Sequence, residues 1–166
     1  RSPLGNVYGE IKGKSDYSIL LDAHLDEVHF IVTSIDQDGF LHIDKVGGPD
    51  LRPLSGAEVT VFAAKPLYGI VCKYELEDGK APDVDKIKID IGFSGTEAQK
   101  RVKPGDRVTF LQPSEFCLNN KITAKSLDDR AGVACLLLVA QKLKNAGEIP
   151  CNVQLLFSQF EEIGGM

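Results

Sequence analysis

The sequence predicts an α/β domain interrupted by an all-β insert of about ninety residues, a size within the ordinary range of domains. Three observations lead to this prediction. A strand-like segment near each end of the chain and a helical pattern between them have the order of a parallel α/β unit. The stretch 47–113 holds six of the eight prolines and half of the sixteen glycines. Short β-rich runs recur in that stretch, so a small barrel or sandwich is expected there.

The two ends of the chain supply the α/β elements. A strand is expected over 17–22, which has an apolar centre of one isoleucine and two leucines. Ala, Leu, Val and Lys follow a helical pattern over 129–145, and Gly147 and Pro150 supply the stop signal. A second strand is expected over 152–158, where four large apolar side chains lie close together.

The insert is divided by turn signals. Two β-rich runs, 28–35 and 40–46, flank Asp-Gln-Asp-Gly, which is a strong hairpin signal. Ser94 and Glu97 have the spacing of a capping box, which predicts a short helix near 96–101. Further strands are expected at four β-rich runs, 58–63, 68–74, 86–91 and 107–111. The predicted domains are therefore 28–122 for the β-rich insert, and 1–27 with 123–166 for the α/β part.

Composition excludes several classes of protein. The 166 residues are 43% hydrophobic and 26% charged, which is typical of a globular chain and not of a disordered one. A net charge of −5 without basic blocks argues against nucleic acid or an anionic membrane as a partner. The longest apolar stretch, 131–140, is far short of a membrane span, and the start has no apolar signal region. The four widely spaced cysteines are expected to be reduced, mostly buried thiols of a cytoplasmic protein.

Three polar clusters lie where an α/β sheet places a site, just beyond a strand or at the start of a helix. The first contains His24 and Asp26, the second opens the helix at Asp128, and the third is Glu161-Glu162. All three fall on one edge of the predicted sheet, where an imidazole and several carboxylates would suit zinc, cobalt or manganese. An adjacent Glu pair also allows one carboxylate to bind metal while its neighbour acts as general base.

Each cluster alone also has an ordinary structural explanation: a polar loop, a helix cap or a solvated turn. Other catalytic chemistries lack their motifs, since the sequence has no Gly-x-Ser-x-Gly elbow, Walker loop or Gly-x-Gly-x-x-Gly. His29 and His42 fall in the predicted hairpin strands, where a structural or surface role is expected. A glycosidase that used Glu161 or Asp128 would need a sugar cleft with stacking aromatics, and the chain has no Trp.

Five segments together form a known set of motifs. They are Asp22-Ala-His24-Leu-Asp26-Glu27, Ile89-Asp90-Ile91-Gly92, Val102-x-Pro104-Gly105-Asp106, Ser126-Leu127-Asp128-Asp129-Arg130 and Phe160-Glu161-Glu162-Ile163-Gly164. This set resembles the glutamyl/tetrahedral aminopeptidase family, di-metal aminopeptidases whose members have often been labelled endoglucanases. The last segment corresponds to the family's Gln-Glu-Glu-Val-Gly motif, with Phe160 in place of Gln. The resemblance runs over essentially the whole chain.

The resemblance implies a partial metallopeptidase-type α/β sandwich and a site for two divalent ions per subunit, zinc or cobalt. By resemblance, His24 would bind one ion, Asp128 would bridge the two, and Glu162 would bind the second. Glu161 would be the general base. Asp26 would orient His24, because an imidazole ligand needs its other N–H held. The implied substrates are peptides with a free N-terminus.

The family also implies an assembly and a longer chain. Its inserted β-domain mediates dimerisation, and the dimers build a hollow twelve-subunit tetrahedron. Its site needs a further aspartate and a further histidine beyond the Glu-Glu motif, whereas this chain stops at Met166. We therefore expect a part of a larger aminopeptidase, inactive as an isolated chain. The alternative is a non-catalytic assembly or dimerisation fragment built around the β-insert.

Overall fold

The computed structural model describes residues 1–76 and 78–164, which form two compact units. One unit combines residues 1–27 with the segment from Ser126 onward, and the other is 28–125. The sequence-based boundary at 122/123 lies three residues before the observed one at 125/126. The chain is thus mixed α/β, with a β-rich unit inserted into a discontinuous one.

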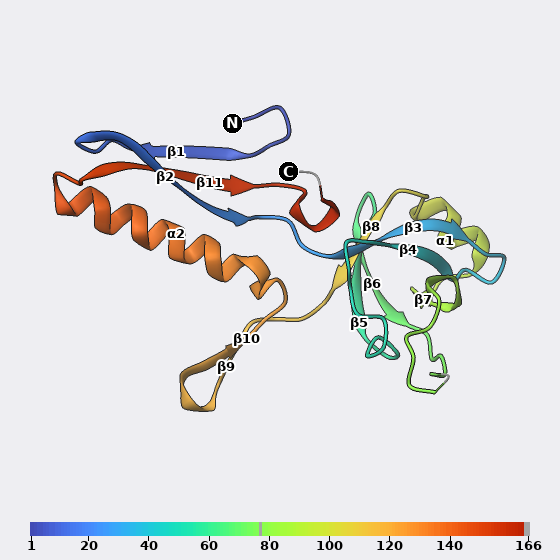
Figure 1. The fold of residues 1–166 in the computed structure, drawn as a ribbon. Coiled ribbons are helices and arrows are strands. Elements are labelled where there is room, and N and C mark those ends of the chain that lie inside the picture. The colour runs from blue at the N-terminus through green and yellow to red at the C-terminus, as the bar shows by residue number, and fades with distance from the viewer. Residues whose placement is uncertain (77, 165–166) are drawn as a thin grey trace. The chain divides into compact units, whose positions relative to one another are not determined.

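The discontinuous unit is a three-stranded sheet with a long helix on one face (Figure 1). Strands β2 (Ser15–His24) and β11 (Cys151–Ser158) are parallel neighbours, and α2 (Leu127–Ala146) lies between them in sequence. The predicted parallel α/β unit is therefore confirmed. Strand β1 (Val7–Ile11) was not predicted, and it pairs antiparallel with β11 to give the order β1-β11-β2.

The core of this unit lies where the sheet meets α2. Its buried side chains come from β2, α2, β11 and the turn before β11: Ala23, Leu136, Ile149, Val153 and Leu155. The helix ends at Gly147, whose φ of 79° suits glycine and agrees with the predicted stop. None of the helices in the described ranges is both long and apolar enough to cross a membrane.

The inserted unit is a closed barrel of six antiparallel strands in the order β3-β4-β7-β6-β5-β8 (Figure 1). The strands are β3 (His29–Ile35), β4 (Leu41–Val46), β5 (Glu58–Phe62), β6 (Pro66–Val71), β7 (Lys88–Asp90) and β8 (Arg107–Phe110). The sequence predicts a barrel-like insert, and the closed barrel confirms it. The barrel is formed because β8 pairs with both β3 and β5 and so joins the two edges of the sheet.

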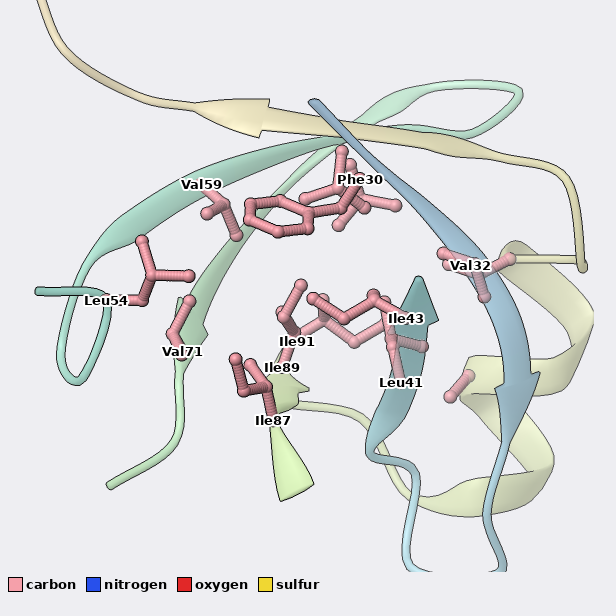
Figure 2. Close-up of a cluster of buried hydrophobic side chains, with 14 of the residues drawn as sticks. Phe30, Val32, Leu41, Ile43, Leu54, Val59, Val71, Ile87, Ile89 and Ile91 are labelled. Carbon is pink, nitrogen blue, oxygen red and sulfur yellow. The ribbon is translucent and has the colours of Figure 1, made fainter. Parts of the chain in front are cut away.

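Inward-facing residues of these strands fill the barrel (Figure 2). Phe30 and Val32 of β3, and Val59 and Val61 of β5, alternate with more exposed neighbours, as expected for strands with one buried face. The Phe30 ring packs edge-on against Phe110, with ring centroids 5.7 Å apart. Burying a side chain of this kind stabilises the fold by roughly 1.5–3 kcal/mol.

The short helix α1 (Gly95–Arg101) is confirmed, but the capping box that predicted it is wrong. Ser94 occupies the N-cap position, yet its side chain makes no cap hydrogen bond. The Glu97 carboxylate pairs with Lys100 at 2.8 Å and with Arg101 at 3.3 Å. These pairs with the following turn stabilise the helix surface in place of the reciprocal cap.

Several smaller features differ from the expectations. The hairpin of β9 (Glu115–Cys117) and β10 (Lys121–Thr123), joined by η2 (Leu118–Asn120), was not predicted. The short helix η1 (Val84–Lys86) precedes β7, so the strand expected over 86–91 is shorter. The expectation of mostly buried cysteines is wrong: Cys117 and Cys135 are exposed, and Cys72 and Cys151 are half-buried.

Candidate metal centre

Three segments of the discontinuous unit meet at the carboxyl ends of the parallel strands. His24 at the end of β2 lies opposite Ser158 at the end of β11, and the Leu25 N–H donates to the Ser158 carbonyl at 2.8 Å. Asp128 lies at the start of α2, and η3 (Glu161–Ile163) follows β11. The parallel register therefore places together residues that are more than a hundred positions apart, such as His24 and Asp128.

The His24 side chain is 9% exposed and is bonded through both ring nitrogens. Its Nδ1 donates to the Asp26 carbonyl at 3.1 Å, and its Nε2 lies 3.0 Å from Asp128 Oδ1. Burial lowers the pKa of His24, but the hydrogen bonds to the Asp128 carboxylate and the Asp26 carbonyl, together with the negative charges of Asp26 and Glu161, outweigh it, so the pKa is raised. A divalent cation at Nε2 would compete with any proton bound to that nitrogen.

Asp26 contacts both the imidazole and the Glu-Glu turn. Its carboxylate oxygen Oδ1 lies 3.7 Å from His24 Nδ1, beyond hydrogen-bond distance, so its backbone carbonyl is the group that holds the ring. Its carboxylate accepts the backbone N–H of Glu161 at 3.3 Å and that of Glu162 at 3.2 Å. The orienting role of Asp26 stays a prediction, and the structure shows its carbonyl at the ring and its carboxylate at the Glu-Glu turn.

The two glutamates of η3 differ in surroundings. Glu161 Oε2 lies 3.8 Å from His24 Nε2, which places its carboxylate beside the imidazole. Burial raises the pKa of Glu162, and the negative charges of Asp128, Glu161 and Asp26 raise it further against the lowering effect of His24. The carboxylates of Asp26, Asp128 and Glu161 all lie within 4 Å of the imidazole nitrogens, an excess of negative charge that a divalent cation would offset.

Asp129 and Ser126 have local roles beside the site. The Asp129 carboxylate accepts the Gly132 N–H at 2.9 Å, which satisfies a backbone donor of the first helical turn. The peptide bond between Asp128 and Asp129 is cis. The Ser126 hydroxyl donates to the Glu27 carboxylate. His29 and His42 lie on the barrel strands β3 and β4, where the sequence placed them.

These residues fit a divalent metal ion in donor type but not in donor number. An imidazole nitrogen and carboxylate oxygens are ligands that zinc, cobalt and manganese accept. In residues 1–76 and 78–164, no group of three His, Cys, Asp or Glu residues is close enough to hold a metal ion. A catalytic zinc takes three protein ligands plus water, so the described residues do not complete a site.

The model of the M42 glutamyl aminopeptidase family matches residues 5–166. The chain belongs to this family. This match confirms the resemblance that the five motifs indicated. The M42 family consists of metal-dependent aminopeptidases. The putative aminopeptidase SgcX of Escherichia coli (strain K12) is 35% identical over an alignment of 174 positions, gaps included. The alignment covers 98% of this chain and 46% of that relative.

Solved M42 structures show the same fold. A TET aminopeptidase from a marine sediment archaeon of the Thaumarchaeota superposes with a TM-score of 0.87 at 32% identity, over 98% of this chain and 49% of that chain. The TET1 peptidase of Pyrococcus horikoshii, which can assemble into a tetrahedron or a large octahedral shell, superposes with a TM-score of 0.83 at 33% identity. That match covers 98% of this chain and 51% of the other. The chain therefore spans about half the length of the M42 proteins it matches.

The sequence analysis did not predict one contact near the site. The Gln159 N–H, two residues before Glu161, donates to the Asn6 side-chain oxygen at 2.9 Å. Asn6 precedes a strand that was itself not predicted, and the contact joins positions 153 residues apart. The only local signal is the Gly5-Asn6 pair, which is a common turn dipeptide.

Proposed function

We propose that the complete protein is a metal-dependent aminopeptidase that hydrolyses the N-terminal peptide bond of peptides with a free amino terminus. The observation that supports this proposal is the meeting of His24, Asp128 and the Glu161-Glu162 turn at one sheet edge of an M42 family member. In this proposal His24, Asp128 and Glu162 are metal ligands. The remaining ligands, an aspartate and a histidine in the family pattern, come from sequence outside these 166 residues.

The residues of this chain then have distinct tasks. His24, Asp128 and Glu162 would help to hold two divalent ions, zinc or cobalt, which would supply Lewis-acid chemistry for the water and the scissile carbonyl. Glu161 takes a proton from the attacking water at a carboxylate oxygen and delivers it to the leaving amine nitrogen as the C–N bond breaks. Asp26 holds the imidazole through its carbonyl and the two glutamates through its carboxylate, which keeps the base beside the ligands.

The deciding experiment is a Glu161→Gln substitution in the complete protein. Glutamine preserves shape but cannot take a proton, so kcat should fall by about 10²- to 10⁴-fold while bound metal per subunit stays unchanged. Turnover is measured on a panel of amino-acid p-nitroanilides with zinc, cobalt or manganese. Glu148→Gln is the matched control, because Glu148 is an exposed partner of Lys14 away from the site.

Metal removal is the second arm of the same test. Dialysis against a chelator should abolish turnover, and addition of zinc or cobalt should restore it. Full activity after the metal has been removed, or wild-type turnover by Glu161→Gln, would overturn the proposal. A loss of activity in Glu148→Gln equal to that in Glu161→Gln would also refute the role of Glu161.

The barrel unit suggests a second function, which does not exclude the first. We propose that it mediates dimerisation and that dimers assemble to a dodecamer, as the tetrahedral assembly of the P. horikoshii relative suggests. The outward face of β5 and β6 supports this proposal, because Phe62, Tyr68 and Ile70 are 41–50% exposed there. A purely structural role for the chain remains the alternative if the metal-dependent activity is absent.

A further inference from the structure

The segment before β1 forms a closed loop that ends at Asn6. The Ser2 N–H donates to the Asn6 carbonyl at 2.9 Å, and the Asn6 N–H donates to the Ser2 hydroxyl oxygen at 3.1 Å. The Gly5 N–H also donates to the Ser2 carbonyl at 3.0 Å. Gly5 has a φ of 93°, a conformation that favours glycine, so the chain turns sharply just before Asn6.

Because of this turn, the backbone pairing between β1 and β11 ends before the carboxyl end of β11 is passed. Val7 is the first residue of β1 and lies opposite Phe157. Two positions further out, an antiparallel ladder would place Gly5 opposite Gln159, but β1 begins only at Val7. The Asn6 side-chain oxygen accepts the Gln159 N–H at 2.9 Å instead. A side-chain oxygen thus replaces the strand partner where the ladder stops.

The bond lies directly before the two glutamates assigned to the reaction. Gln159 is followed by Phe160, which has a φ of 66°, and then by Glu161 and Glu162 of η3. Asp26 holds the backbone N–H groups of Glu161 and Glu162, as described above. The turn is therefore bonded to the segment that follows β2 through Asp26 on one side and to the amino-terminal loop through Asn6 on the other. Figure 1 shows this loop and the turn at the same end of the sheet.

We propose that Asn6 is a positioning residue for the Glu161-Glu162 turn. The inference rests on the proposed aminopeptidase function, in which Glu161 moves the proton and Glu162 binds metal. Loss of the Asn6 acceptor would leave the Gln159 N–H without its partner and would release one of the two anchors of the turn. Both carboxylates would then sample positions away from the site, which lowers kcat more than it raises KM.

The chain offers a matched control at the other end of the same sheet. The Asn152 side-chain oxygen accepts the Gly13 N–H at 2.9 Å, which is the same kind of bond at the same distance. Asn152→Ala therefore removes an equivalent contact from the same unit without touching the turn after β11. Asn6→Asp keeps an acceptor oxygen in the same place and is the conservative variant.

The experiment compares Asn6→Ala, Asn6→Asp and Asn152→Ala in the complete protein. For Asn6→Ala we expect kcat on the p-nitroanilide panel to fall by roughly 10- to 100-fold, with KM within about twofold of wild type. Asn6→Asp should recover most of kcat, and Asn152→Ala should keep it. Amide hydrogen exchange should be faster at 159–162 in Asn6→Ala and unchanged there in Asn152→Ala.

Three results would overturn the inference. They are wild-type kcat in Asn6→Ala, an equal fall of kcat in Asn152→Ala, and no recovery in Asn6→Asp. If the wild-type protein hydrolyses no substrate with any of the metals, the proposed function fails, but hydrogen exchange still tests the anchor. Unchanged exchange at 159–162 in Asn6→Ala would then refute the role of Asn6 on its own.

Discussion

Asp36 in the β3–β4 turn shows how one side chain can organise a local structure. Its carboxylate accepts the Phe40 N–H at 3.0 Å and the Lys88 ammonium at 3.1 Å, and it lies 3.4 Å from His42 Nε2. Burial works to raise the pKa of Asp36, but the bonds to Lys88, Phe40 and His42 lower it to about 2. The ionised carboxylate therefore joins the turn to β4 and β7.

This low pKa predicts how the barrel responds to acid. A folded-state pKa of about 2 lies below the unfolded value, so the contribution of Asp36 to stability is complete above about pH 4 and is lost as pH falls through about 2. Asp36→Asn lacks this contribution. We expect its urea midpoint to fall less than that of wild type between pH 4 and pH 2.

Asp38→Asn is the control for this prediction, because it removes a carboxylate from the same turn while the Asp36 bonds remain. Its acid response should follow that of wild type. Parallel acid curves for Asp36→Asn and wild type would show that the pairing of Asp36 does not contribute to the pH dependence.

At the scale of elements, the sequence correctly predicted the helix α1, but the contacts that stabilise it are not those that the prediction assumed. The capping-box spacing predicts the helix, yet the Ser94 side chain makes no cap bond and Glu97 pairs forward along the helix. The helix is also held by burial, because Ala98 is 0% exposed and packs against the barrel core. Tertiary contact therefore stabilises a segment too short to be helical alone.

Ser94→Ala should consequently cost little stability. A cap serine that makes its bond contributes about 1 kcal/mol, whereas we expect less than about 0.5 kcal/mol here, measured by urea unfolding. Asp106→Ala is the comparison, because the buried Asp106 carboxylate accepts the Lys103 N–H at 3.0 Å in the same unit. Its loss should cost about 1–3 kcal/mol. An equal loss of unfolding free energy in the two variants would contradict the conclusion that the Ser94 side chain makes no stabilising cap bond.

At the scale of the whole molecule, the two units have separate cores. The barrel core is drawn entirely from residues within 28–125, and the cluster between the sheet and α2 is drawn from the other unit. Among the described residues, each core cluster contains side chains of its own unit alone, so each unit has its own apolar cluster to bury.

We therefore expect residues 28–125 to fold when expressed alone. Cooperative urea unfolding would show this, and Ile89→Ala, at a position that is 0% exposed, should lower stability by about 2–5 kcal/mol. Light scattering on the same sample tests the proposed dimerisation. A disordered circular dichroism spectrum would contradict independent folding, and a monomer at all concentrations would count against the dimer.

Local patterns in the sequence determined the order and kind of most elements. The β2–α2–β11 unit, the β3–β4 hairpin and the β-rich insert follow from hydrophobic periodicity and turn residues, which depend only on neighbouring positions. The three polar clusters were also visible, because each follows a strand or opens a helix. Their common edge follows from the parallel topology, which the order of elements implies.

Only the tertiary structure decided features that depend on pairing between distant segments. The closure of the barrel depends on the pairing of β8 with both β3 and β5. Strand β1 forms because it pairs with the edge of β11. The Asp26 carbonyl rather than its carboxylate holds His24, and Asn6 reaches Gln159 across 153 positions. Such contacts are set by register and by backbone direction at the end of a strand, and a local pattern of residue types carries neither.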